Sequence, residues 1–185
     1  MTIRLKRSID MSTIINTLDL ELLDHPEYKY LFVGDWHDLS EELKSIGWTE
    51  DAFLIMLKHD EEEVCIGYVK WRCNRTHDEV SNVSMLLSPE YLNSGIGAYV
   101  MARLLFYLLE DRGYRKIRFL CFSNNARGLR LYRKFLEFGG REVGLYKEDF
   151  KLRDGKYYDN IAFELLKKDF QSTSKLTRLA SRVVI

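Results

Sequence analysis

Several segments in the first half of the chain have the apolar and polar patterns that are typical of β-strands. Thr2–Ser8 alternates apolar with charged residues, whereas Ala52–Lys58 and Val64–Trp71 are rich in leucine, isoleucine, valine and aromatic residues. The acidic stretch His59–Glu63 separates the last two segments, so together they predict a β-hairpin. Glu79–Leu87 predicts another strand, which ends at a Ser-Pro step because proline cannot extend a central ladder.

Helical spacing appears between and after these strands. Apolar residues recur at roughly helical intervals in Ser12–Phe32. From Gly97 onward, apolar residues lie on one helical face at Met101, Leu104, Leu105 and Leu108. Gly113 predicts the end of that helix, and Lys116–Phe122 alternates again as a strand. The order strand, loop, helix, strand is a crossover connection, which implies locally parallel strands.

The rest of the chain predicts a helix at about 126–136 and two strands, Arg141–Lys151 and Tyr157–Leu166. We therefore expect a single α/β (α+β) domain over residues 1–170. Its mixed, twisted sheet should have about six or seven strands, with helices on both faces. Residues 171–185 are Ser/Thr-rich and basic with an apolar end, and we expect a tail that is flexible or docks on a partner subunit.

The charge balance, cysteines and histidines narrow the classes of function. Lys plus Arg and Asp plus Glu each number 28, so no global field attracts nucleic acid or an anionic membrane. The 3 cysteines form no CxxC pair and the 4 histidines are scattered, so we expect free thiols and no metal site. The first residues lack a signal-peptide run, and no stretch reaches the roughly 18 apolar residues that span a bilayer. A cytoplasmic protein is therefore expected.

The stretch Ser88–Ala98 is the most informative, because it joins a strand to an amphipathic helix through small residues. Glycines let the backbone approach a ligand, and the first helical amides, with the helix dipole, attract phosphate oxygens. The alternative is that Gly95 and Gly97 only permit a tight turn. A P-loop would need Lys-Ser/Thr after its last glycine, and this chain has Ala-Tyr. A dinucleotide fold would need a third glycine where Val100 stands.

Two segments resemble the signatures of the GNAT superfamily of N-acetyltransferases. Pro-Glu-Tyr at 89–91 and Gly-Ile-Gly at 95–97 resemble its pyrophosphate loop, and Asn125 with Leu-Tyr-Arg-Lys at 131–134 is similar to its second signature. Residues 25–28 and 65–69 look like the early helix and third strand of the ribosomal-protein-type and amino-sugar-type branches. The resemblance extends over residues 2–168.

The resemblance implies that acetyl-CoA lies between the fourth and fifth strands. Pantetheine would pair with backbone near 85–87 and hydrogen-bond Asn125, the pyrophosphate would meet loop amides, and Lys134 would meet a phosphate. The family usually has Arg or Gln at Leu92, and its glycine after the second signature lies further downstream here, at 139–140. The implied acetyl-CoA-binding residues are Met85, Leu86, Leu87, Leu92, Asn93, Ser94, Gly95, Ile96, Gly97, Ala98, Asn125 and Lys134.

Acetyl transfer to an amine needs a neutral amine, a stabilised oxyanion and a proton for the departing thiolate. Tyr132 stands at the family's general-acid position, so the resemblance implies that it protonates the sulfur. The alternative is a buried tyrosine that only packs and hydrogen-bonds. Glu79 is the candidate general base, with His77 and Asp78 as rivals. A water chain in place of a dedicated base, and a charged turn that simply faces water, are left open.

The expected function is acetyl transfer from acetyl-CoA to a primary amine, by direct attack through a tetrahedral intermediate. The acceptor is a small molecule, an amino-sugar nucleotide or a protein N-terminal amine. Tyr158, Asp159 and the pair Trp36-His37 are candidates to line its pocket. A homodimer is left open. The alternatives are a noncatalytic acyl-CoA-binding module on the same scaffold and a subunit whose tail from Lys175 docks elsewhere.

Overall fold

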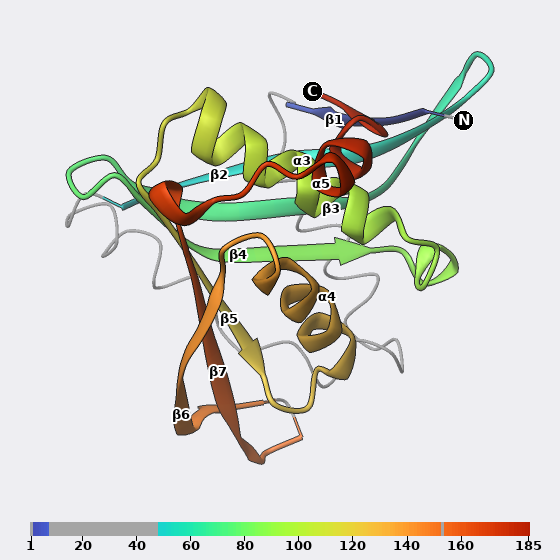
Figure 1. The fold of residues 1–185 in the computed structure, drawn as a ribbon. Helices are drawn as coiled ribbons and strands as arrows, with labels where there is room; N and C mark the ends of the chain where they lie inside the picture. The colour runs from blue at the N-terminus through green and yellow to red at the C-terminus, as the bar shows by residue number, and fades with distance from the viewer. Residues whose placement is uncertain (1, 8–47, 153) are drawn as a thin grey trace.

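The computed structural model describes residues 2–7, 48–152 and 154–185, which form one open mixed sheet of eight strands with three α-helices (Figure 1). The strand order is β6-β7-β5-β4-β3-β2-β1-β8. The elements are β1 (Thr2–Lys6), β2 (Trp48–His59), β3 (Glu62–Asn74), β4 (Glu79–Leu87), α3 (Ile96–Phe106), β5 (Lys116–Phe122), α4 (Ala126–Leu136), β6 (Arg141–Lys151), β7 (Tyr157–Leu166), α5 (Ser174–Ala180) and β8 (Val183–Val184). The expected helical segment 12–32 and the pair Trp36-His37 lie outside the described residues.

The hairpin expected from the apolar segments is the pair β2 and β3, which is antiparallel from Trp48↔Asn74 to His59↔Glu62. Asp60 has a φ of 53° in the connecting turn, a conformation that aspartate tolerates better than most residues. The ring centroids of Phe53 and Trp71 lie 5.3 Å apart across the two strands. Consecutive residues of β2, from Ala52 to Ile55, are all at most 4% exposed, so both faces of the hairpin are buried at its centre. This agrees with the continuous apolar runs of the sequence.

Helix α3 follows the predicted spacing and packs its apolar face on the sheet. Val100, Met101, Leu104 and Leu105 are all at most 1% exposed. The helix continues as a π-helical turn, Tyr107–Asp111, in which the amide of Arg112 donates to the carbonyl of Tyr107 at 2.8 Å. Gly113, with a φ of 75°, then ends it, as expected for a left-handed glycine after a helix.

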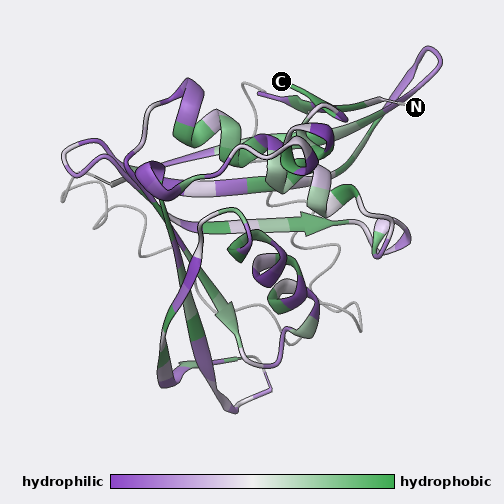
Figure 2. Ribbon diagram, in the orientation of Figure 1, coloured by the Kyte–Doolittle hydropathy of each residue, from purple (hydrophilic) through white to green (hydrophobic). Residues whose placement is uncertain are grey.

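Helices α3 and α4 cover the same face of the sheet. Met101 of α3, Tyr132 of α4, Phe119 of β5 and Phe163 of β7 all line one apolar hollow, which requires the two helices to share that face. Figure 2 shows hydrophobic residues where these helices meet the strands and hydrophilic residues on their outward sides. The helices expected on the opposite face belong to the segment outside the described residues.

Residues 171–185 pack against the chain's own α3 and β1. Thr173 caps α5 by accepting a hydrogen bond from the amide of Leu176 at 3.2 Å, and the Leu176 side chain is fully buried. Val183 then pairs with Ile3, so β8 extends the sheet as a parallel edge strand. This is an eighth strand beyond the six or seven expected, because two residues are too short to give a strand pattern. The domain boundary at 170 stays a prediction.

Candidate active site

The central feature of the site is a gap between the parallel strands β4 and β5. The two strands pair only at Glu79↔Lys116 and Val80↔Ile117, although β4 continues to Leu87. Beyond that point they diverge, as Figure 1 shows. The β5-facing edge of β4 therefore presents backbone groups that have no ladder partner, and a ligand with amide groups can pair with them.

A β-bulge explains the divergence. Asn82 has a φ of 50° in the middle of β4, and the β3–β4 register shifts between Lys70 and Arg72, opposite the same place. A bulge adds an unpaired residue and increases the local twist, which turns the rest of the strand away from its neighbour. This bulge was not predicted, because an asparagine inside an apolar strand segment gives no distinctive pattern.

The loop before α3 presents free amides at the end of β4. Gly95 is the N-cap of α3 with a φ of 89°, and Asn93 has a φ of 60°. Such left-handed residues turn neighbouring amides toward one side, which creates an anion-binding concavity at the positive end of the helix. Within the described part of the chain, no acceptor bonds the amides of Asn93, Gly95 and Gly97. The loop thus has the geometry expected for a pyrophosphate site.

The other loop residues hold this turn in place. Ser94 donates its hydroxyl to the carbonyl of Tyr91 and accepts from the amide of Ile96 at 3.3 Å. The Ile96 side chain is 3% exposed and anchors the helix start, whereas Ala98 already bonds back to Gly95 at 3.0 Å. Leu92 is half-buried and packs against the core. Its aliphatic side chain brings no charge to the loop.

Gly97 connects the loop, β4 and α4. A Cβ at this position would lie 3.7 Å from the Met85 sulfur, 3.8 Å from Leu87 and 4.0 Å from Leu131. Leu86 alternates with these two β4 residues, is 6% exposed and pairs with Tyr68 of β3. The predicted pantetheine strand and the predicted pyrophosphate loop therefore lie side by side.

Tyr132 reaches from α4 into the gap. Its hydroxyl donates to the carbonyl of Val83 at 3.1 Å, immediately after the bulge in β4. Its ring packs against Phe119 and Phe163, with centroid distances of 5.2 and 5.8 Å. Burial raises the pKa of Tyr132, and the neighbouring Cys121 raises it further, so the phenol keeps its proton at neutral pH. The structure therefore places a protonated hydroxyl beside β4, where this strand diverges from β5.

Asn125 and Lys134 occupy the two ends of α4. The side-chain oxygen of Asn125 caps the helix by accepting from the amide of Gly128 at 2.8 Å, which leaves its NH₂ group as a donor. A Cβ at Gly128 would lie 2.7 Å from that same NH₂ group, so a larger residue there would displace the Asn125 side chain. This capping role was not among the predictions, although Asn directly before a helix is a standard signal for it. Lys134 is exposed on the last turn.

Glu79 lies at the closed end of the gap, away from Tyr132. It is the first residue of β4, is 8% exposed and forms an ion pair with Arg118 of β5. Four residues of strand separate it from Val83, where the Tyr132 hydroxyl binds, which is on the order of 13 Å. The rivals His77 and Asp78 precede it in the turn at the same end. The structure thus does not bring these three together with Tyr132.

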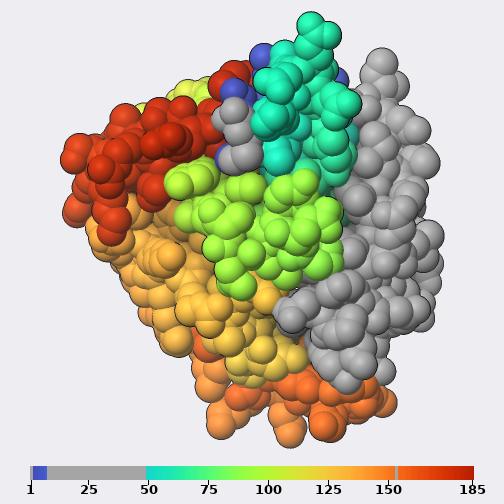
Figure 3. Space-filling model, turned by 90° about the vertical axis from the view of Figure 1, so that its right-hand side faces the viewer, coloured from blue at the N-terminus to red at the C-terminus, as the bar shows by residue number. Residues whose placement is uncertain are grey.

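The β6–β7 hairpin borders the open end. The carbonyl of Asp159 accepts from the amide of Ser123, just beyond β5, at 2.9 Å, and its carboxylate accepts from the amide of Glu148 at 2.9 Å. Tyr158 donates its hydroxyl to Asp154 at 2.7 Å. Figure 3 shows this side of the molecule, where the end of β4 with the start of α3, then α4, then the hairpin follow one another.

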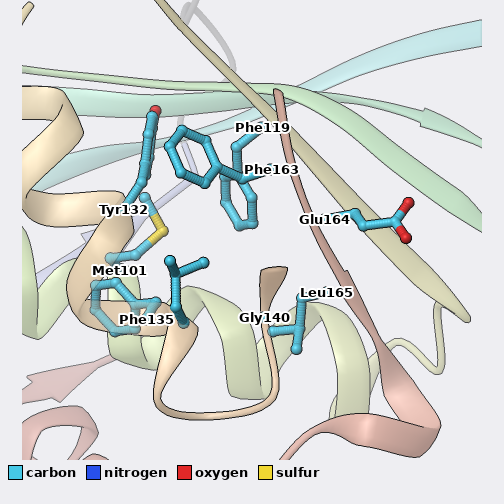
Figure 4. A pocket seen from close by; sticks show the side chains of 9 residues that line it. Met101, Phe119, Tyr132, Phe135, Gly140, Phe163, Glu164 and Leu165 are labelled. Atoms are coloured by element: carbon cyan, nitrogen blue, oxygen red, sulfur yellow. The ribbon is translucent and has the colours of Figure 1, made fainter. Parts of the chain in front are cut away.

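A small apolar hollow lies behind Tyr132, under α4. Figure 4 shows the ring of Tyr132 as one wall, with its hydroxyl pointing away from the hollow, and the Glu164 carboxylate directed to the other side of β7. The hollow is therefore part of the helix–sheet seam. Its lining offers no row of polar groups for a nucleotide, and we assign the ligand site to the gap instead.

The structure thus places a break between two parallel strands, a turn with free amides and a tyrosine side by side. Within the described residues, no group of three or more His, Cys, Asp and Glu side chains could hold a metal, and no helix is long and apolar enough to cross a membrane.

Comparison with known proteins identifies the family. The model of the acetyltransferase (GNAT) family matches residues 18–138, which is more than half of the chain, so the chain belongs to this family. It is accordingly an acyltransferase whose family uses acetyl-CoA and transfers the acetyl group to amines. A search of curated protein sequences found no match.

Solved structures share the fold. Spermidine N-acetyltransferase from Vibrio cholerae, in complex with CoA and spermine, has a TM-score of 0.63 at 21% identity, over 91% of this chain and 96% of that one. A dodecameric structure of that enzyme has a TM-score of 0.64 at 20% identity, over 90% of this chain and 94% of that one. A GNAT-family acetyltransferase from Bacillus anthracis has a TM-score of 0.54 at 18% identity, over 63% of this chain and 66% of that one.

Proposed function

We propose that this protein transfers an acetyl group from acetyl-CoA to a primary amine by direct attack of the amine on the thioester. The observation that carries the proposal is the position of Tyr132, whose hydroxyl lies between the diverging strands at Val83. Family membership gives the class of reaction, and the gap, the loop and this phenol support the proposed location. The neighbours' polyamine acceptors support an amine of small size as the second substrate.

Each part of the site has a separate task in this proposal. The amides of Asn93, Gly95 and Gly97 would bind the pyrophosphate, and the free edge of β4 after Asn82 would pair with the pantetheine. The thioester would then lie beside the Tyr132 hydroxyl. The amine nitrogen attacks the thioester carbonyl, the C–S bond breaks, and the thiolate takes the phenolic proton. The phenol recovers a proton from solvent.

The proton that the amine loses has no dedicated acceptor in this scheme. Glu79 is engaged by Arg118 at the closed end of the gap, so we propose that the amine reaches the site neutral and that its nitrogen, which becomes positively charged on attack, then loses one proton to water. This arrangement makes turnover rise with pH as the free amine becomes more abundant. A noncatalytic acyl-CoA-binding module is the second candidate, and the engagement of Glu79 is the observation that favours it.

Calorimetric titration with acetyl-CoA, and separately with NAD and ATP, tests the ligand. Gly95→Ala should weaken acetyl-CoA binding, because its φ of 89° disfavours a side chain, whereas Gly144→Ala, on the exposed edge strand β6, is the matched control. Thiol release against a panel of amines tests the reaction. Selective acetyl-CoA binding with release for one amine class supports the proposal. Binding without release from any amine favours the noncatalytic module, and no acetyl-CoA binding overturns both.

A further inference from the structure

An orphaned amide oxygen lies at the open end of the sheet. Asn160 of β7 sits between Phe122 of β5 and Tyr146 of β6 and is 2% exposed. Its Nδ2 donates to Oδ2 of Asp149 at 2.9 Å, but its Oδ1 is buried and has no hydrogen-bond partner in the described part of the chain. Because both atoms are bonded to one carbon, this unused acceptor lies next to the Asp149 carboxylate.

A break in the β6 ladder brings Asp149 to this position. The β6–β7 register shifts between Tyr146 and Phe150, and Glu148 has a φ of 47°. The amide of Glu148 donates to the Asp159 carboxylate at 2.9 Å, which holds the bulge. Asp159, which was predicted to line the pocket for the amine substrate, therefore stabilises the bulge next to Asp149 instead.

Aromatic rings complete the surroundings. Phe122 pairs directly with Asn160, so the two side chains share the sheet face opposite α4. Phe150 pairs with Tyr158, two residues from Asn160, and its ring lies edge-on to Phe122 at 5.9 Å. Phe122 is also the last residue of β5, at the open end of the gap. The carboxylate, the amide oxygen and the rings thus meet beside the proposed active site.

We infer that Asn160 and Asp149 form a subsite for an ammonium group of the acceptor. An ammonium donates the hydrogen bond that Oδ1 lacks, neutralises the carboxylate and is attracted to aromatic faces. Within the described residues, no lysine or arginine forms an ion pair with Asp149. An anionic group would be repelled here, and an apolar one would leave the buried oxygen unpaired.

This inference rests on the proposed function and narrows its acceptor. The attacking nitrogen must be neutral, whereas the subsite selects a charged nitrogen, so one nitrogen cannot satisfy both at the moment of attack. The acceptor therefore carries a second amine, as a diamine or polyamine does. The subsite holds the charged end while the other end faces the thioester.

The test compares 1,5-diaminopentane with hexylamine and 6-aminohexanoate, which have similar length but a neutral or an anionic far end. The wild-type protein should use the diamine with a kcat/KM at least tenfold above either competitor. Asp149→Asn and Asn160→Leu should raise the KM for the diamine about tenfold, more than they change kcat, and leave the acetyl-CoA Kd unchanged. Glu148→Gln removes a neighbouring carboxylate and should leave the diamine KM as it is.

Two results overturn the subsite while leaving the transferase intact. One is turnover of hexylamine as efficient as that of the diamine. The other is an unchanged diamine KM in Asp149→Asn, an exposed position whose substitution keeps the fold even if Asn160→Leu does not. An equal rise of KM in Glu148→Gln would show a diffuse charge effect and also overturn it. Failure of the proposed function is distinguishable, because then no amine releases thiol in the wild-type protein.

Discussion

Replacing Tyr132 with phenylalanine removes one oxygen from the centre of the proposed site. Within the described part of the chain, the hydroxyl donates one hydrogen bond, to the Val83 carbonyl at 3.1 Å, so its loss should cost about 1 kcal/mol of folding stability. The ring contacts with Phe119 and Phe163 remain, so the variant should fold. A positioned general acid contributes about 10²–10⁴-fold to a rate, and we expect kcat to fall about 100-fold or more.

The assay is steady-state thiol release at saturating amine, together with calorimetric titration of acetyl-CoA. The acetyl-CoA Kd should change less than about threefold, because the loop amides that bind the pyrophosphate are untouched. Tyr107→Phe is the matched control, since its hydroxyl also hydrogen-bonds, at 3.1 Å to Arg7, but lies at the far end of α3. Burial raises the pKa of Tyr132, so wild-type activity should not decline from loss of this proton below about pH 9. A kcat within threefold of wild type in Tyr132→Phe would refute the general-acid role.

Three further outcomes follow from buried groups elsewhere. Leu176→Ala should destabilise the protein by about 2–5 kcal/mol in denaturant titrations, because this fully buried side chain attaches α5 to α3. Burial raises the pKa of the Cys121 thiol to about 12, so an aromatic disulfide reagent at pH 8 should label the partly exposed Cys65 first and Cys121 only after unfolding. The Lys116 ammonium, 2.7 Å away, lowers the pKa of Glu164, so this pair stabilises the fold at neutral pH and loses its effect as acid protonates the carboxylate. Glu164→Gln should therefore lower the denaturant midpoint of unfolding at pH 7, and its stability should fall less steeply than that of the wild type below about pH 4. If the stability of the variant falls as steeply with acid as that of the wild type, the stabilising role of the Glu164–Lys116 pair is contradicted.

The sheet and α3 were predictable because their side-chain periods are local. The apolar run of Val64–Trp71, the alternation in Lys116–Phe122 and the helical face through Met101 and Leu105 each follow from neighbours within a few residues. The glycine loop was predictable for the same reason, since its small residues stand together between a strand and a helix. The family resemblance then predicted the ligand of this loop, the pyrophosphate of acetyl-CoA.

The subsite at Asn160 was not predictable, because its members come from three strands and meet only through register. Phe122, Asp149 and Asn160 approach one another because Glu148 adopts a left-handed conformation that shifts β6. No residue period encodes such a shift. Likewise, the distance of Glu79 from Tyr132 depends on which end of β4 pairs with β5, a property of the parallel register rather than of the residues themselves.

The pairing of β8 with β1 has a consequence for the order in which the sheet forms. Ile3 and Val183 are hydrogen-bonded neighbours in the sheet although about 180 positions separate them in the sequence. Closing so long a loop costs more chain entropy than forming a local hairpin such as β2–β3. We therefore expect this edge of the sheet to close late in folding, as a step of high contact order. Until it closes, the outer edge of β1 has unpaired backbone groups, which another chain could bind.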